Sequence, residues 1–337
     1  MMRFKMMKVI PQKQIGASPN RLTKINDRKR PSADCPIHPM QEALGDAEFQ
    51  VQIGIPPINL LAEHGWRFDT LGSVTAVTLR GHHFLGWPGL VDEFGIAQTP
   101  GYAQAKPGSP FLKIGIGELQ RLDGKDYQFS RPYPVTRWGG QTVEQSRLKL
   151  AFRQNFSGHN GWAYDYHKSY QVEAGATRLH IDYALSNTGR HPLDTDQYNH
   201  NFFCFDGVEV SRSYRLQLGF PVVPAPCLWL RHGKNRLTDF HPVAAGSYFA
   251  STQAAPADQN HFRVTHQKTG QSVLVHGDYP VSRFALWANQ FFLSPEVFVA
   301  VRLMPGQSLR WRRSYEFHLN ADPRSSNSSA AGPQPVR

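Results

Sequence analysis

RLHIDYAL, residues 178–185, is the stretch that decides the class of fold. Leu179, Ile181, Tyr183 and Leu185 alternate with mostly polar neighbours, so the apolar side chains recur with a period of two. This period is typical of a half-buried β-strand, in which successive side chains point to opposite faces. No segment of a dozen residues keeps the helical period of 3.6, and only Met40–Ala47 looks briefly helical.

The same alternation recurs on both sides of this stretch, and turn residues separate the strands that it predicts. Further strands are expected at Val74–Leu79, Arg147–Phe152, Tyr164–Val172, Tyr214–Leu218, Gln271–Val275, Phe284–Trp287, Phe298–Leu303 and Leu309–Phe317, the last interrupted by Arg313. Turn signals follow several of them, among them Asn187-Thr188-Gly189 and Pro305-Gly306. Many short strands with frequent turns predict an all-β fold, a large antiparallel β-sandwich.

The two ends of the chain differ in composition from its middle. Residues 1–44 are polar, basic and without hydrophobic periodicity, which predicts a disordered arm. Residues 321–337 read as a flexible tail, rich in Ser, Pro, Ala and Gly. No linker divides the segment between these ends, so we expect one β-sandwich domain over residues 45–320.

The charge and the cysteines exclude several classes of protein. The chain of 337 residues carries a net charge of +11, but residues 1–34 hold nine Lys or Arg and two Asp, which leaves +4 for the remainder. The folded segment therefore does not predict nucleic-acid binding. No apolar run is long enough to span a membrane. Cys35, Cys204 and Cys227 are widely spaced, which favours a reducing, cytoplasmic compartment and predicts no metal site.

The densest polar and aromatic cluster is Tyr198-Asn199-His200-Asn201-Phe202-Phe203. It follows the strand at 178–185 after a turn, where a loop enters a sheet. The ordinary pKa of histidine suits proton transfer near neutrality, and the flanking amides can orient the imidazole or bind hydroxyl groups. A loop histidine bonded to the backbone is the alternative.

Residues 161–203 resemble the galactose mutarotase-like (aldose 1-epimerase) family, in a divergent bacterial branch. They read GWAYDYHKSYQVEAGATRLHIDYALSNTGRHPLDTDQYNHNFF. The resemblance extends over roughly residues 65–318, through Gly89–Gly95, Pro110–Gly117, Ser294-Pro295-Glu296, Met304–Gln307 and Trp311–Phe317. It implies a supersandwich whose concave face binds a monosaccharide, with no metal or organic cofactor.

In the family, a histidine protonates the ring oxygen of the sugar while a glutamate takes the proton of the anomeric hydroxyl. This chemistry needs an acid and a base on opposite sides of one carbon. The resemblance places His200 at the acid position. The glutamate is expected in Leu286-Trp287-Ala288-Asn289-Gln290, where alanine stands in its place. Glu296 is the first replacement as base and Glu93 is the second.

Several further residues are expected to bind the substrate. The resemblance suggests that His82 or His83 supplies a second histidine, and alternation on a strand allows only one of them to point inward. Other candidates are Asn199, Asn201 and Arg80 for hydroxyl groups, and Trp87, Trp162 and Trp287 as stacking surfaces for a sugar ring.

Two functions follow from these residues. The first is an isomerase, a mutarotase that interconverts the anomers of a free sugar or a sugar derivative. The alternative is a carbohydrate-binding protein that kept the cleft but lost the base, as Ala288 suggests. The expected partner is a small-molecule carbohydrate in either case, and no residue pattern indicates an oligomeric state.

Overall fold

The computed structural model describes residues 41–54, 66–222, 231–232, 235–240, 247–251 and 254–320. Over these residues the chain forms antiparallel β-strands, as the alternation predicts, together with two short 3-10 helices, η1 (Phe205–Gly207) and η2 (Ala257–Gln259). Residues 1–40 of the arm expected at 1–44, and the tail at 321–337, lie outside the described residues, whereas residues 41–44 belong to a β-strand.

One large sheet has nine strands in the order β1-β2-β3-β5-β13-β21-β20-β17, and β4 pairs with β3. Its strands are β1 (Gln41–Gly45), β2 (Phe49–Gly54), β3 (Ser73–Leu79), β4 (His82–His83), β5 (Leu85–Phe94), β13 (Leu193–Phe203), β17 (Ser247–Ser251), β20 (Arg283–Ala288) and β21 (Leu293–Leu303). Strands far apart in sequence, β5, β13 and β21, are neighbours at its centre.

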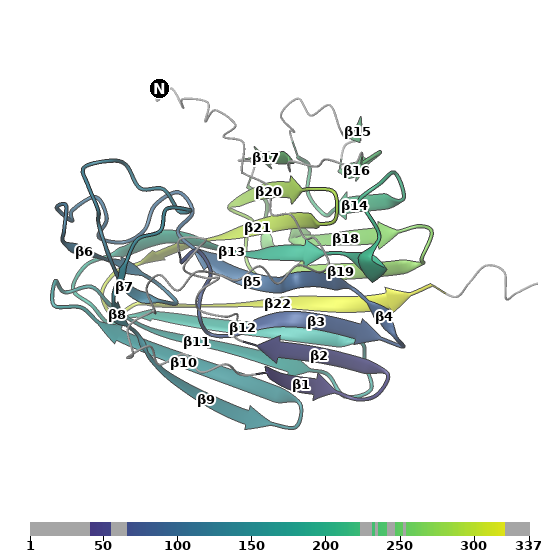
Figure 1. The fold of residues 1–337 in the computed structure, drawn as a ribbon, viewed down its shortest axis with the longest axis horizontal. Helices are drawn as coiled ribbons and strands as arrows, with labels where there is room; N and C mark the ends of the chain where they lie inside the picture. Colours follow the sequence, from purple (N-terminus) through teal and green to yellow (C-terminus); the bar gives the residue numbers. More distant parts are fainter. Residues whose placement is uncertain are drawn as a thin grey trace, which may run out of the picture.

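The second large sheet has ten strands in the order β15-β16-β14-β18-β19-β22-β12-β11-β10-β9. Its strands are β9 (Gly140–Ser146), β10 (Lys149–Ser157), β11 (Ala163–Val172), β12 (Arg178–Asn187), β14 (Tyr214–Leu218), β15 (Arg231–His232), β16 (Arg236–Thr238), β18 (His261–His266), β19 (Gln271–Gly277) and β22 (Ser308–Leu319). A three-stranded sheet of β6 (Pro110–Lys113), β7 (Gly117–Gln120) and β8 (Val135–Trp138) lies at one end of the molecule, on the left in Figure 1.

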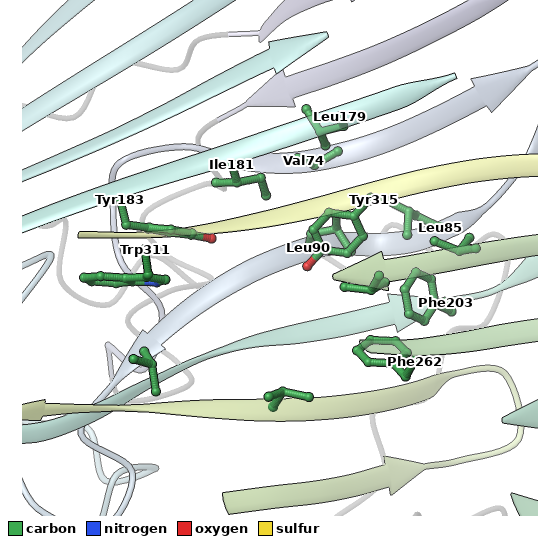
Figure 2. Close-up of a cluster of buried hydrophobic side chains, with 14 of the residues drawn as sticks. Val74, Leu85, Leu90, Leu179, Ile181, Tyr183, Phe203, Phe262, Trp311 and Tyr315 are labelled. Carbon is green, nitrogen blue, oxygen red and sulfur yellow. The ribbon is translucent and has the colours of Figure 1, made fainter. Parts of the chain in front are cut away.

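The apolar faces of the two large sheets form a common core. Leu179 and Ile181 of β12 and Tyr315 of β22 join one buried cluster with Leu90 of β5 and Phe203 of β13 (Figure 2). β12 and β22 bury alternate side chains, as the period of two requires, whereas β5 and β13 bury consecutive side chains on both faces over part of their length. We call the side of the nine-stranded sheet that faces this core its inner face, and the opposite side its outer face.

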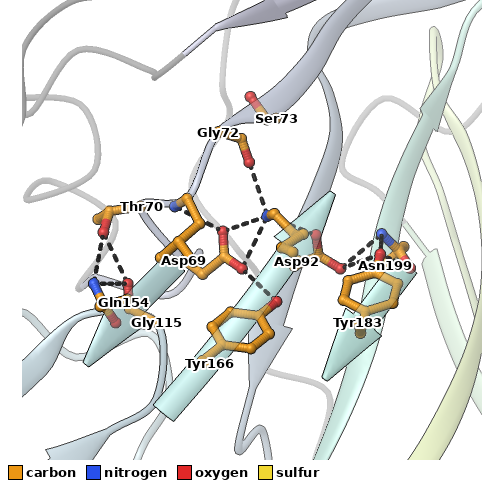
Figure 3. A network of polar contacts seen from close by, with 12 residues as sticks. Asp69, Thr70, Gly72, Ser73, Asp92, Gly115, Gln154, Tyr166, Tyr183 and Asn199 are labelled. Atoms are coloured by element: carbon orange, nitrogen blue, oxygen red, sulfur yellow. Dashed lines mark hydrogen bonds and ion pairs between the residues drawn. The ribbon is translucent and has the colours of Figure 1, made fainter. Parts of the chain in front are cut away.

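The inner layer also holds a buried network of charged and polar groups. Lys168 of β11 binds Asp69 at 2.7 Å and Asp92 of β5 at 2.9 Å, and its side chain is fully buried. Tyr166 donates a hydrogen bond to Asp69, and Tyr183 donates one to Asp92 (Figure 3). The network therefore ties β11 and β12 of one sheet to β5 of the other through charges that compensate one another.

The expected short helix at Met40–Ala47 is not formed, because Gln41–Gly45 is strand β1, paired along its whole length with β2. Its weak local preference yields to the hydrogen bonds of the sheet edge. Strand pairing consequently begins four residues before position 45. Among the described residues, no helix is long and apolar enough to cross a bilayer.

Candidate functional site

His200 lies on the outer face of β13, at the centre of the nine-stranded sheet. Val91 of β5 is its cross-strand partner on one side. On the other side, Gln197 pairs with Val299 and Phe203 pairs with Leu293. This register places Glu296 of β21 directly across from His200, which brings together the two residues that head our list of candidates.

The two side chains are in contact and share a third partner. His200 Nε2 lies 3.5 Å from Glu296 Oε1. The Ser294 hydroxyl lies 3.0 Å from His200 Nδ1 and donates a hydrogen bond of 3.1 Å to Glu296 Oε1. His200 is 5% exposed and Glu296 is 2% exposed. The imidazole and the carboxyl therefore lie side by side, rather than apart as we expected from the family's mechanism.

Burial sets the protonation of both groups. It lowers the pKa of His200 well below its ordinary value of 6.5, and the positive charge of Arg67 acts in the same direction. Burial raises the pKa of Glu296 to about 8, against the opposing effects of Arg67 and the Ser294 hydroxyl. At neutral pH the imidazole is consequently neutral, and most of the Glu296 carboxyl carries a proton.

Glu93, the second candidate base, also lies on the outer face, but its carboxylate is already bound. Arg67 forms an ion pair with it at 3.0 Å, and the Tyr198 hydroxyl donates to the same oxygen at 2.5 Å. Arg67 in turn lies over the rings of Phe68 and Phe129. A carboxyl group whose oxygens are bound by these partners suits an orienting role better than proton transfer.

Aromatic rings enclose the His200 imidazole. Phe202 stacks on it with ring centres 4.1 Å apart, and the ring of Trp287 meets it edge-on at 5.2 Å. The ring of Phe68 lies edge-on to the imidazole, with ring centres 6.1 Å apart. Phe202 and Trp287 are half-buried, so the side of this cluster that reaches solvent presents aromatic surface. Trp287, an expected stacking surface, is thus next to His200.

The two asparagines that flank His200 point to the inner face, because neighbours on a strand alternate. Asn199 donates to Asp92 at 2.8 Å and accepts a hydrogen bond from Arg313. Asn201 donates to the backbone of Pro295 and accepts from Tyr315. Their side chains stabilise the core network and do not face the imidazole, although the Asn201 backbone N–H reaches Ser294 on the outer side at 2.9 Å.

Of the other expected substrate-binding residues, Arg80, His83 and Trp87 are exposed and His82 is half-buried. His82 binds Asp206 at 2.8 Å, and His83 has the Thr78 hydroxyl as its side-chain neighbour. Arg80 forms an exposed ion pair with Glu48. Trp87, which precedes a cis proline bond, is 51% exposed. No contact in the described residues joins these four to His200.

Two positions that the sequence singled out, Ala288 and Trp162, lie apart from the contacts of His200. Ala288, which stands where the family's glutamate was expected, is fully buried on the inner face of β20, whereas its neighbour Trp287 contacts His200 on the outer face. A glutamate at 288 would point into the core. Trp162 packs on His191, among the partly buried residues around the main core.

This chain is similar to known proteins in its structure, although not in its sequence. No family model and no curated protein matches the sequence. A galactose mutarotase-like protein from Lactobacillus casei ATCC 334 superposes with a TM-score of 0.54 at 13% identity, over 83% of this chain and 100% of that one. A galactose mutarotase related enzyme from Lactobacillus acidophilus has a TM-score of 0.54 at 11% identity, over 84% and 99% of the chains. A GalM/aldose epimerase homologue from C. elegans has a TM-score of 0.51 at 11% identity, over 84% and 100%.

The chain has the galactose mutarotase-like fold. The fold predicted from strand periodicity and from the quoted motifs is thereby confirmed. Because the sequence identities are low, the similarity establishes the fold and not the activity.

Three residues of the site in this galactose mutarotase-like fold, Ser294, Tyr198 and Arg67, are not among the candidates that the sequence suggested. Ser294 stands in the quoted Ser-Pro-Glu motif and Tyr198 in the quoted cluster around His200, so alternation from Glu296 and His200 could have placed both on the outer face. Arg67 lies in a segment without hydrophobic periodicity, before the strands that carry the other residues of the site. No signal in the sequence singles it out.

Proposed function

We propose that this protein is an aldose 1-epimerase-like mutarotase, in which His200 and Glu296 act as the acid–base pair. The observation that carries the proposal is their direct contact, at 3.5 Å, on the outer face of the central strands. At neutral pH His200 is a neutral imidazole and Glu296 is mostly a protonated carboxyl, because burial lowers the pKa of the first and raises the pKa of the second.

The reaction that this pair suits is the opening of a cyclic sugar. One proton goes to the ring oxygen, one leaves the anomeric hydroxyl, and the bond between the anomeric carbon and the ring oxygen breaks. Both oxygens are bonded to the same carbon, so an adjacent donor and acceptor reach both of them. Closure on the other face of the aldehyde returns both protons and yields the second anomer.

The protonation of the pair supports an assignment of roles opposite to the family's. In the free protein the transferable proton lies on Glu296, and His200 has an imidazole nitrogen free to accept one. We therefore assign Glu296 as the acid for the ring oxygen and His200 as the base for the anomeric hydroxyl. Glu93 and Arg67 are assigned to orientation, and Trp287 and Phe202 to contact with the sugar ring.

The test is the rate of anomer interconversion, followed by proton NMR on freshly dissolved glucose, galactose and a uronic acid. We expect the wild type to accelerate interconversion of at least one of these sugars. His200→Ala should reduce the acceleration by about 10²–10⁴-fold, the usual contribution of a general acid or base. Wild-type protein that neither accelerates nor binds any of them would contradict the proposal.

The second candidate function is carbohydrate binding without catalysis. Glu93 is held by Arg67 and Tyr198, and the family's glutamate position is occupied by the buried Ala288, which favours this alternative. Saturable binding in calorimetry, with no acceleration by the wild type, would identify this function instead.

A further inference from the structure

Ser294 is the one side chain that contacts both members of the candidate acid–base pair in the described part of the site. It lies on β21 two residues before Glu296, and it is fully buried. Its hydroxyl oxygen is 3.0 Å from His200 Nδ1 and 3.1 Å from Glu296 Oε1. The backbone N–H of Asn201 donates to the same oxygen at 2.9 Å.

These three contacts favour one arrangement of the protons. A hydroxyl group has one proton to donate and two lone pairs that accept. The Asn201 N–H occupies one lone pair, and the proton goes to the carboxyl oxygen of Glu296. With the serine proton directed at Glu296, the remaining lone pair faces His200 Nδ1, and this arrangement places the proton of the neutral imidazole on Nδ1. His200 Nε2 is then unprotonated, 3.5 Å from Glu296.

We propose that Ser294 is a positioning residue, which selects the tautomer of His200 with its proton on Nδ1 and thereby leaves Nε2 as the nitrogen that exchanges protons. The hydrogen bond from Asn201 fixes the hydroxyl through the backbone, so the selection is built into the pairing of β13 with β21. The kinetic consequence rests on the proposed function, whereas the tautomer itself does not.

Serine, histidine and glutamate are also the residue types of a hydrolytic triad, but the contacts of Ser294 do not fit that role. A nucleophilic serine directs its oxygen at the substrate and donates its proton to histidine. Ser294 is fully buried, all its hydrogen-bonding capacity is used, and it donates to the glutamate itself. These features favour positioning over acyl transfer.

The test combines a spectroscopic and a kinetic measurement on the full-length chain. With ¹⁵N-labelled histidine, the ring resonances of His200 are assigned by their loss in His200→Ala. We expect a protonated Nδ1 and an unprotonated Nε2 in the wild type. In Ser294→Ala the Nδ1 proton loses its acceptor, so the tautomer with its proton on Nε2 should gain in population, and kcat should fall by about 10²-fold with KM little changed.

Two further variants complete the experiment. Ser294→Cys keeps nearly the same volume and weakens the hydrogen bonds, so it should show the same direction of change if the alanine variant does not fold. Ser282→Ala removes another hydroxyl, which donates to the backbone of Phe298 at 2.9 Å, and should leave the His200 tautomer and kcat as in the wild type.

The outcomes separate the two proposals. A wild-type tautomer with its proton on Nε2, or one that neither Ser294 variant changes, would overturn the positioning role. A tautomer that changes as expected in a wild-type protein without mutarotase activity would support the positioning role and contradict the proposed reaction.

Discussion

His200 and Glu296 occupy facing positions on two adjacent strands, and both side chains are almost fully buried. Neutral forms are favoured under these conditions, because a charge without a fully matched partner is costly in a buried site. The contact of Ser294 with both groups supplies hydrogen bonds that do not require charge. The site therefore retains a proton donor and a proton acceptor at neutral pH.

The raised pKa of Glu296 predicts a dependence of stability on pH. Its folded-state pKa is about 8 against an ordinary value of 4.5, so the folded protein binds this proton more tightly than the unfolded chain. The stability that it contributes is present in full below about pH 4.5 and is lost as pH rises toward about 8. The loss amounts to at most about 1.4 kcal/mol for each pH unit.

Chemical unfolding of the wild type and Glu296→Gln between pH 5 and pH 8 measures this effect. The variant should gain stability relative to the wild type as the pH rises. Glu48→Gln, which removes an exposed carboxyl, should follow the wild-type curve. Parallel curves for the wild type and Glu296→Gln would show that the Glu296 carboxyl is ionised in the folded protein throughout this range.

At the scale of the elements, the buried ion pairs of Lys168 join the two large sheets. Lys168→Met leaves Asp69 and Asp92 facing one another without a compensating charge, although Asp69 already has a pKa raised to about 6, chiefly by burial. We expect this change to lower the free energy of unfolding by about 3–5 kcal/mol.

The matched control is Arg153→Met on the adjacent strand β10, which removes an exposed ion pair with Asp165. It should have no measurable effect on stability, because solvent screens such pairs. Denaturant titrations of both variants measure the difference. Equal effects would mean that the Lys168 network contributes no more than a surface pair.

Strand periodicity predicted most of the elements, because half-buried strands alternate wherever one face meets the core. The interruption at Arg313 in β22 had a different cause. Arg313 occupies an inner position and donates to Asn199 and to the backbone of Val297, so its charge belongs to the polar layer of the core. A pattern of apolar residues does not reveal a charge that is buried with its partners.

Alternation also accounts for what could and could not be predicted of the site. His200 and Glu296 were recognised from local motifs, and their contact depends on the register of β13 and β21, which no local pattern specifies. Asn199 and Asn201 flank His200 in sequence, and for that reason their side chains face the core. Arg67 reaches the site from a segment without periodicity.

At the scale of the whole molecule, the galactose mutarotase-like fold brings strands that are distant in sequence to one sheet centre. β5 supplies Glu93, β13 supplies His200 and Tyr198, and β21 supplies Ser294 and Glu296. The antiparallel pairing of these three strands directs all five side chains to the outer face. A single site is thus assembled from residues that lie up to 203 positions apart in the chain, from Glu93 to Glu296.

The most direct test of this account is a double-mutant cycle on the rate of anomer interconversion. It compares kcat/KM for the wild type, His200→Ala, Glu296→Gln and the protein that carries both changes. Residues that transfer protons as one unit are strongly non-additive, so each single change should cost nearly as much as the two together. Losses that multiply would contradict a shared acid–base pair, as would single variants that keep the activity of the wild type.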